Sequence, residues 1–255
     1  LGTGLAAGTI GGLLGLGGGI VLMPLLRFGF GLPPMYAAGT CIVAVFFTTL
    51  GGSYRHYRMG HVKFRPLLPV VAAGVASVVA ASIIFPHLDV RDRWVDLGIG
   101  LVFALIALRM MIEGLLRTRV GQSASGGSGD IGGSLTAKTA IGAVAGALPG
   151  FLGIGTGGIL VPAFTFLLKA PIRAAIGGSL FCFCLNSLIS SGFKMAQGYV
   201  DFGLALPVSL GTLIGANIGA GLNGRFSSRV LKLLFGIVFV YVALKFILSF
   251  FGVRI

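Results

Sequence analysis

Charged residues are scarce in this chain, and acidic residues are the scarcest of them. Only 10% of the 255 residues are charged and six are Asp or Glu, whereas about a quarter of an average soluble domain is charged. The acidic residues stand near the ends of apolar runs or in a polar stretch between them. The composition therefore excludes an ordinary soluble domain, and it leaves no mid-membrane carboxylate for the proton relay that many pumps use.

Cysteine is also rare, and this argues against metal chemistry. Cys41, Cys182 and Cys184 lie inside apolar runs without a metal-binding spacing, so we expect small buried side chains; a thiol contact to a sulfur-containing solute is the alternative. No Ser or Cys is placed as a nucleophile partner for a histidine, and no Lys-Ser/Thr follows Gly17–Gly19 as in a nucleotide loop. We expect no enzyme activity, no metal and no cofactor.

The chain is instead rich in long apolar runs. Mean hydropathy is +1.02, and runs of about 20 residues, enough to cross a bilayer as a helix, recur along the chain. They cover residues 3–29, 34–53, 66–86, 95–116, 136–168, 172–194, 202–223 and 229–252. The net charge of +13 comes mainly from basic residues at the ends of these runs. That pattern is typical of membrane-protein loops, so we predict an all-α, multi-pass membrane protein in a lipid bilayer, with no nucleic-acid partner.

A glycine-interrupted apolar segment occurs twice, 138 residues apart: Leu14–Pro24 and Leu152–Pro162. Five positions are shared: Gly15, Gly17, Gly19, Leu22 and Pro24 recur as Gly153, Gly155, Gly157, Leu160 and Pro162. The same offset relates Gly60 to Gly198 and Pro69 to Pro207. We predict two homologous four-segment transmembrane repeats, 1–116 and 139–255, joined by a Gly/Ser-rich cytoplasmic linker, 117–138.

Loop charges favour inverted repeats. If each glycine-rich segment crosses the membrane, the repeats are parallel and the loop cations divide nine against eight. If each segment is re-entrant, the second repeat is inverted and the cations, with Lys194 counted as a loop residue, divide twelve against five, as the positive-inside rule expects. The twelve expected on the cytoplasmic side are Arg55, Arg58, Lys63, Arg65, Arg117, Arg119, Lys138, Lys169, Arg173, Arg225, Arg229 and Lys232.

The broken segments predict an anion site. The second half of each would begin near Gly18–Ile20 and Thr156–Gly158, with its N-terminus at mid-membrane, where free N–H groups and the helix dipole attract negative charge. Paired broken segments are typical of transporter binding sites. The candidate substrate-binding residues are Gly17, Gly18, Gly19, Ile20, Thr40, Thr48, Thr49, Gly155, Thr156, Gly157, Gly158, Ser179, Asn186 and Ser187, with Ser190 beside them. Under the offset, Thr48 faces Asn186 and Thr49 faces Ser187.

Three of these interpretations have structural alternatives. Glycines at four-residue spacing, as in Gly211, Gly215 and Gly219, let transmembrane helices pack closely, and we expect packing for that run. Ser and Thr within helices often hydrogen-bond to their own backbone. His56 and His61 are expected in a loop, in the basic and aromatic stretch that begins at Tyr54.

The duplicated segment, together with Ala37–Thr40 and Tyr54–Val62, resembles the TauE/SafE sulfite exporter family, also called TSUP, over essentially the whole chain. The resemblance implies a permease of the bacterial or archaeal inner membrane that exports sulfite or a related sulfur-containing anion, such as sulfoacetate or another sulfonate. Gly17–Gly19 and Gly155–Gly158 fall on the family's motif, while Gly177-Gly-Ser179 departs from its Gly-Thr-Ser type pattern. An anion channel and a non-transporting membrane scaffold are the other readings, and the sequence leaves open whether the protein forms a homodimer.

Overall fold

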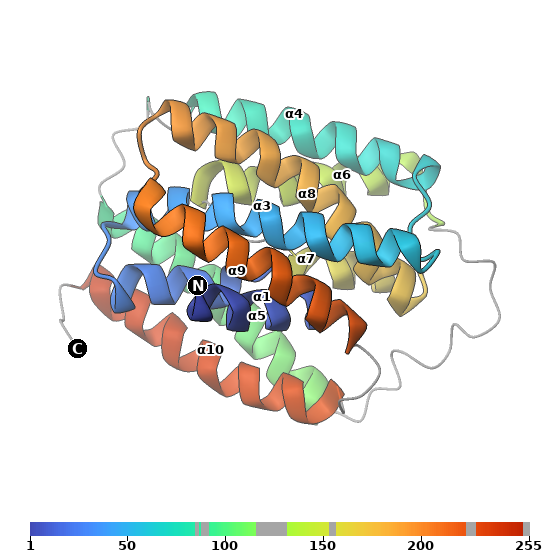
Figure 1. The fold of residues 1–255 in the computed structure, drawn as a ribbon. Helices are drawn as coiled ribbons and strands as arrows, with labels where there is room; N and C mark the ends of the chain where they lie inside the picture. Colours follow the sequence, from blue (N-terminus) through green and yellow to red (C-terminus); the bar gives the residue numbers. More distant parts are fainter. Residues whose placement is uncertain (85–86, 88–91, 116–131, 153–156, 223–227, 252–255) are drawn as a thin grey trace.

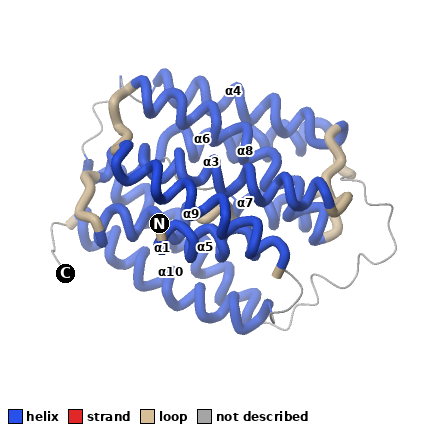
Figure 2. The backbone as a smooth tube through the Cα atoms, in the orientation of Figure 1, coloured by secondary structure: helices blue, strands red, loops and turns tan. Residues whose placement is uncertain are grey.

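The structure, a computed structural model, describes residues 1–84, 87, 92–115, 132–152, 157–222 and 228–251. These residues form a helical bundle and include no strand, as Figures 1 and 2 show. The prediction of an all-α protein is therefore confirmed for the described part of the chain.

The helices of the two halves follow the same order. The first half contains α1 (Gly2–Leu14), α2 (Gly19–Pro24), the π-helical turn η1 (Leu25–Gly29), α3 (Pro34–Arg58), the 3₁₀ turn η2 (Arg65–Leu67), α4 (Leu68–Ile84) and α5 (Asp92–Leu115). The second half contains α6 (Leu135–Leu152), α7 (Gly157–Pro162), the π-helical turn η4 (Ala163–Leu167), α8 (Ile172–Ala196), α9 (Phe202–Gly221) and α10 (Ser228–Phe250). A shift of 138 residues places α2 on α7, η1 on η4 and α3 on α8 without a mismatch at either end.

Local sequence explains several of these boundaries. Pro33 and Pro171 precede α3 and α8, where their fixed φ and missing N–H are tolerated. Asp201 precedes α9, and its carboxylate accepts a hydrogen bond from the N–H of Leu204 at 3.1 Å, which satisfies one of the free donors of the helix. Pro24 and Pro162 end α2 and α7, and each helix continues as a π-helical turn.

Helices α3 and α8 form the centre of the bundle, and their packing is antiparallel. Both are mostly buried, whereas α4 and α9 are less so; in Figure 1, α3 crosses the middle, between α4 and α10 at opposite edges. A Cβ placed on Gly52 would lie 3.1 Å from Leu180, and the hydroxyls of Thr49 and Ser187 lie 3.4 Å apart. Residue numbers thus rise along α3 as they fall along α8.

Another pair of equivalent helices, α5 and α10, is also antiparallel. The rings of Trp94 and Phe250 lie 5.1 Å apart near one end, and those of Phe103 and Phe239 lie 5.9 Å apart further along. Helices that correspond under the 138-residue offset therefore run in opposite directions where they meet.

Glycines join each half to the other through two more helix pairs. On α1, Gly4, Gly8 and Gly12 lie against the backbone of α9 at Val208, Thr212 and Ala216. Their equivalents on α6, Gly142, Gly146 and Gly150, lie against α4 at Val70, Gly74 and Val78. The contacted residues of α9 and α4 also differ by 138, as the glycines of α1 and α6 do. Each half therefore packs its first helix on a helix of the other half, which is the reciprocal pattern of a two-fold contact. The packing role predicted for Gly211, Gly215 and Gly219 is confirmed, because a Cβ on any of them would collide with the backbone of α1.

Four helical segments among the described residues are long and apolar enough to cross a membrane: Pro34–Arg58, Arg65–Ile84, Arg173–Ala196 and Phe202–Gly221. Several residues that were expected in loops lie within helices, among them Arg55 and Arg58 in the last turn of α3. His56 lies within α3 and is 2% exposed, and Lys194 lies within α8 and is 1% exposed, because both helices extend further than their apolar runs. The last residues of the predicted linker, 135–138, already belong to α6.

Candidate functional site

Three glycines in the left-handed region turn the chain between α1 and α2. Gly15, Gly17 and Gly18 have φ angles of 72°, 73° and 72°. Left-handed backbone costs an L-residue about 1–2 kcal/mol, so the glycine-rich sequence is what this turn requires. Gly18 is the residue before α2, and the predicted start of a second half-helix near Gly18–Ile20 is confirmed. The described part of α7 begins at Gly157, and the residues before it, 153–156, lie outside the described residues.

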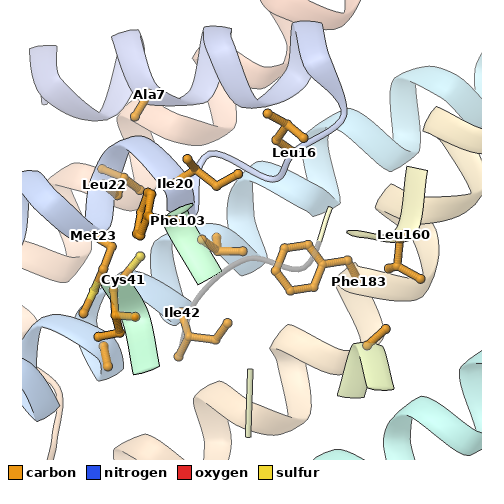
Figure 3. Packing of buried hydrophobic residues seen from close by; sticks show 14 of the residues in the cluster. Ala7, Leu16, Ile20, Leu22, Met23, Cys41, Ile42, Phe103, Leu160 and Phe183 are labelled. Carbon is orange, nitrogen blue, oxygen red and sulfur yellow. The ribbon is translucent and has the colours of Figure 1, made fainter. Parts of the chain in front are cut away.

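The chain doubles back at this turn. A Cβ on Gly18 would lie 3.1 Å from the carbonyl oxygen of Ala7, and one on Gly11 would collide with the backbone of Gly18. In an unbroken helix residues 7 and 18 would stand about 16 Å apart. Figure 3 shows the chain folding back after Leu16, so that Ile20 and Leu22 lie beneath α1. We call α1, the turn and α2 hairpin 1, and residues Gly15–Gly18 tip 1.

Tip 1 lies against side chains from both halves of the chain. A Cβ on Gly17 would lie 2.6 Å from the Phe183 ring of α8 and 3.1 Å from the Thr49 methyl of α3. A Cβ on Gly18 would lie 3.3 Å from the Thr48 side chain. Main chain that approaches its neighbours this closely has room for no side chain larger than hydrogen.

The hydroxyls of Thr49 and Ser187 meet beside tip 1, 3.4 Å apart. These residues are equivalent under the 138-residue offset, so the predicted pairing of Thr49 with Ser187 is confirmed, while that of Thr48 with Asn186 stays a prediction. The contact lies where the two halves meet. Both side chains are fully buried. Thr48 and Asn186, the residues next to them on α3 and α8, are also buried, and we call Thr48, Thr49, Asn186 and Ser187 the polar seam.

Three hydroxyls of the candidate site donate to their own helices. Thr48 donates to the Ala44 carbonyl at 2.9 Å, Thr49 to the Val45 carbonyl at 2.9 Å, and Ser187 to the Cys184 carbonyl at 3.1 Å. The alternative that Ser and Thr within helices bond to their own backbone is therefore confirmed for Thr48, Thr49 and Ser187. Each hydroxyl oxygen still has lone pairs that can accept a hydrogen bond.

Asn186 differs from the hydroxyls. Its side chain is 1% exposed, and its Oδ1 has no hydrogen-bond partner among the described residues. A Cβ on Gly74 of α4 would lie 2.8 Å from both amide heteroatoms, so the glycine makes room for the amide. An unpaired buried polar atom costs about 1–3 kcal/mol, and a bound ligand would recover that free energy.

The remaining candidates fall in three places. Ile20 is buried in the first turn of α2, and the Gly19 carbonyl accepts the Cys41 thiol at 3.6 Å. Thr40 accepts a hydrogen bond from the Asp201 N–H at 3.0 Å, so it joins α3 to the start of α9 rather than facing tip 1. Ser179 donates to the Ile176 carbonyl.

The second glycine tip is described only in part. Gly157 and Gly158 begin α7, while Gly155 and Thr156 lie outside the described residues. Ser190 donates to the Pro149 carbonyl near the end of α6 at 2.8 Å. The three cysteines are free and buried, as predicted, and the described residues include no cluster of three or more metal-ligating side chains.

Two titratable pairs, each with one buried member (His56 or Lys194), occupy equivalent places, and sequence reasoning missed both. His56 and His61 approach through their Nδ1 atoms at 3.3 Å, while Lys194 lies over the Tyr199 ring at 5.7 Å. The offset of 138 relates His56 to Lys194 and His61 to Tyr199, so it would have found them had it been applied to titratable residues. Burial lowers the pKa of His61, and the nearby Arg173 guanidinium lowers it further.

A partly buried ion pair, in which the Asp96 carboxylate is the buried member, fixes the far end of hairpin 1. Arg27 on η1 donates from Nε and Nη2 to Asp96 of α5 at 3.2 and 2.9 Å, and Ser249 of α10 donates to the same carboxylate at 2.9 Å. The equivalent positions of the second half carry Thr165 and Leu234, so this anchor belongs to hairpin 1 alone.

Comparison with known proteins agrees with this architecture. The sulfite exporter TauE/SafE family matches residues 1–246. The probable membrane transporter protein YunE of Bacillus subtilis is 28% identical, covering 96% of this chain and 94% of the relative. A probable membrane transporter protein of Xylella fastidiosa is 30% identical, with 96% and 92% covered. Probable membrane transporter protein MJ0441 of Methanocaldococcus jannaschii is 24% identical, with 91% and 88% covered.

No solved structure matches the chain. The family match nevertheless spans both halves, and with them both glycine-rich segments. The chain therefore belongs to the sulfite exporter TauE/SafE family of membrane transporters.

Proposed function

We propose that the protein exports sulfite or a related sulfur-containing anion, such as a sulfonate, across the inner membrane of a bacterium or archaeon. The anion would bind at mid-membrane between tip 1, its equivalent at Gly155–Gly158, and the polar seam. The observation that carries the proposal is the place of tip 1, which lies against Thr48, Thr49 and Phe183 where the two halves meet. Free N–H groups at the start of a helix favour an anion there.

We further propose that both hairpins are re-entrant. The returning arms are short: α2 and α7 have six residues each, continued by five residues of η1 and η4. Eleven helical residues span about 16 Å, about half of a bilayer core of about 30 Å. An arm of this length supports a return to the side of entry.

The repeats would then be inverted, with three crossings each. The antiparallel packing of α3 on α8 and of α5 on α10 supports this, because equivalent helices cross the membrane in opposite directions only in inverted repeats. Charge agrees as well: Arg55 at the end of α3 lies near Gly221 at the end of α9, and His61 lies near Arg173 at the start of α8. Segments assigned to the cytoplasmic side thus share one end of the bundle.

Membrane potential is a sufficient driving force for this function. Each negative charge that leaves a cell with a negative interior gains about 2.3 kcal/mol per 100 mV. A carboxylate that couples transport to proton movement is then unnecessary. This agrees with the absence of Asp and Glu from the middle of the apolar runs.

Transport in proteoliposomes tests the proposal. We expect saturable uptake of labelled sulfite and of a sulfonate, with a rate that follows an imposed potential and with counterflow of labelled solute. Gly18→Leu should abolish uptake by blocking approach to the main chain, whereas Gly31→Leu, at a glycine with φ 70° and no neighbour within 4 Å of a Cβ, should retain it. Uptake without counterflow would indicate a channel, and no anion uptake at all would refute the proposal.

Single-cysteine labelling tests the membrane arrangement. In a background without the three native cysteines, cysteines at Leu1 and Gly31 should react with an impermeant maleimide from the same side of the membrane. A cysteine at Met59 should react from the opposite side, because α3 lies between Gly31 and Met59. Labelling of Leu1 and Gly31 from opposite sides would contradict a re-entrant hairpin.

A further inference from the structure

Buried polar residues continue along α3 and α8 from the contact between Thr49 and Ser187. On each helix, the residues four and seven positions beyond that contact are again polar. Residues with this spacing share one face of a helix, and none of them is more than 8% exposed. We call the whole set the central track: Thr49, Ser53 and His56 of α3, and Ser187, Ser191 and Lys194 of α8.

The two halves of the central track lead away from the contact in opposite directions, because α3 and α8 are antiparallel. His56 and Lys194 each stand seven residues beyond the contact, which is about 10 Å along the helix axis. The central track therefore extends over about 21 Å of a bilayer core of about 30 Å. In the proposed topology, His56 lies toward the cytoplasm and Lys194 toward the outside.

At the cytoplasmic end, His61 folds back onto His56. The His61 N–H donates to the His56 carbonyl at 3.0 Å, and the two Nδ1 atoms lie 3.3 Å apart. A Cβ on Gly177 of α8 would lie 3.2 Å from the His56 Cβ and 3.4 Å from the His61 carbonyl oxygen, so this end packs on α8. The His56 Nε2 is buried and has no hydrogen-bond partner among the described residues. A bound oxyanion would satisfy this nitrogen when it carries a proton.

At the outer end, Tyr199 folds back onto Lys194 through the equivalent turn. The Tyr199 N–H donates to the Lys194 carbonyl at 3.0 Å, and the Lys194 ammonium lies 5.7 Å from the centre of the Tyr199 ring. This turn packs on α3, where a Cβ on Gly39 would collide with the Tyr199 carbonyl and the Tyr36 ring lies 6.0 Å from the Tyr199 ring. Ionisable side chains inside transmembrane helices commonly mark the path of a transported ion.

We propose that His56 and Lys194 are equivalent anion subsites, and that each receives the transported sulfur oxyanion between mid-membrane and one face of the membrane. Lys194 would attract the anion by its charge, and His56 would donate from Nε2. Ser53 and Ser191 lie between these subsites and the central contact, and a hydroxyl proton can rotate toward a passing oxyanion. This inference rests on the proposed function and names residues along its path.

The two subsites differ in charge. A lysine is charged at neutral pH, whereas an imidazole is charged only in part. We therefore expect the subsite at His56 to bind an anion more weakly than the subsite at Lys194, and a lysine at position 56 to bind it more tightly.

Sulfite uptake into membrane vesicles of both orientations tests the subsites one at a time. Inside-out vesicles present the cytoplasmic face to sulfite, and right-side-out vesicles present the outer face; vesicles from cells without the protein give the background. His56→Leu should raise the half-saturating sulfite concentration at least fivefold in inside-out vesicles and less than twofold in right-side-out vesicles. Lys194→Met should show the reverse. A role in folding alone would change both faces alike.

Two matched controls remove similar side chains elsewhere. Lys245→Met removes another lysine that lies over an aromatic ring, 5.1 Å from the centre of the Phe28 ring, and His87→Leu removes an exposed histidine. Both variants should keep both half-saturating concentrations within twofold of the wild type.

Exchange variants keep the test available if His56→Leu or Lys194→Met does not fold. Each installs the residue found at the equivalent position. His56→Lys should lower the half-saturating concentration at the cytoplasmic face at least threefold, and Lys194→His should raise it at the outer face at least threefold.

The outcomes separate the two claims. Half-saturating concentrations that change equally on both faces, or on neither face, would overturn the two subsites while leaving the transport function intact. Wild-type vesicles that take up no sulfite and no sulfonate above background would overturn the proposed function and the subsites together.

Discussion

Close packing of tip 1 can be separated from its backbone strain by two glycine-to-alanine substitutions. Gly17 and Gly31 have nearly the same φ, 73° and 70°. A Cβ on Gly17 would lie 2.6 Å from the Phe183 ring and 3.1 Å from the Thr49 methyl, whereas one on Gly31 meets nothing within 4 Å. Gly31→Ala therefore measures the conformational cost alone, and Gly17→Ala adds the cost of contact.

The expected magnitudes follow from these two terms. Left-handed backbone costs an alanine about 1–2 kcal/mol, and this applies to both variants. Forcing an extra methyl group into a packed interior costs about 1–3 kcal/mol more, and this applies to Gly17→Ala only. The Phe183 ring is fully buried, so it has little room to move away.

Thermal unfolding of the purified protein in detergent provides the measurement. For a chain of this size about 1 kcal/mol corresponds to a shift in Tm of about 2–4 °C, so Gly17→Ala should melt at least about 2 °C below Gly31→Ala. Equal shifts for the two variants would refute the reasoning, because Gly17 would then have room for a methyl group on the side that faces Phe183 and Thr49.

Two further predictions concern helix packing and the anchor of hairpin 1. Gly8→Ala should destabilise the protein by about 1–3 kcal/mol, since the new methyl group would collide with α9. Gly192→Ala is the control: a Cβ at Gly192 meets nothing within 4 Å, so this variant should not lower Tm. Equal changes in Tm for the two variants would contradict the packing of α1 on α9. Arg27→Met should cost about 3–5 kcal/mol by leaving the Asp96 carboxylate buried without its cation. The double variant Arg27→Met with Asp96→Leu should recover most of that loss in a denaturation series, and no recovery would contradict a paired role.

Tip 1 and the central contact could be predicted from sequence because their chemistry is local or symmetric. Only glycine adopts the left-handed backbone of tip 1 without cost, so the interruption is visible in the residues themselves. The contact of Thr49 with Ser187 followed from the repeat, since residues at a symmetry axis meet their own equivalents. Neither inference required knowledge of which helices pack together.

Other features depend on tertiary packing and could not be predicted. Thr40 resembles the seam hydroxyls in sequence, yet it bonds the Asp201 N–H, because α9 of the other half packs against α3. Arg27 and Asp96 are 69 residues apart, and neither belongs to a recurring pattern. Helices that are apolar on every side carry little information about their neighbours. The packing of α1 on α9 and of α6 on α4, each in the other half, could therefore not be derived from periodicity.

The location of a bound anion tests the central claim most directly. Selenite has the charge and shape of sulfite, and its selenium scatters anomalously, so crystals grown with it would reveal its position. The account predicts a selenium peak within hydrogen-bonding reach of the backbone at Gly17–Gly19 and of the polar seam at Asn186 and Ser187. A peak beside basic residues at either end of the bundle, with none at the seam, would contradict it.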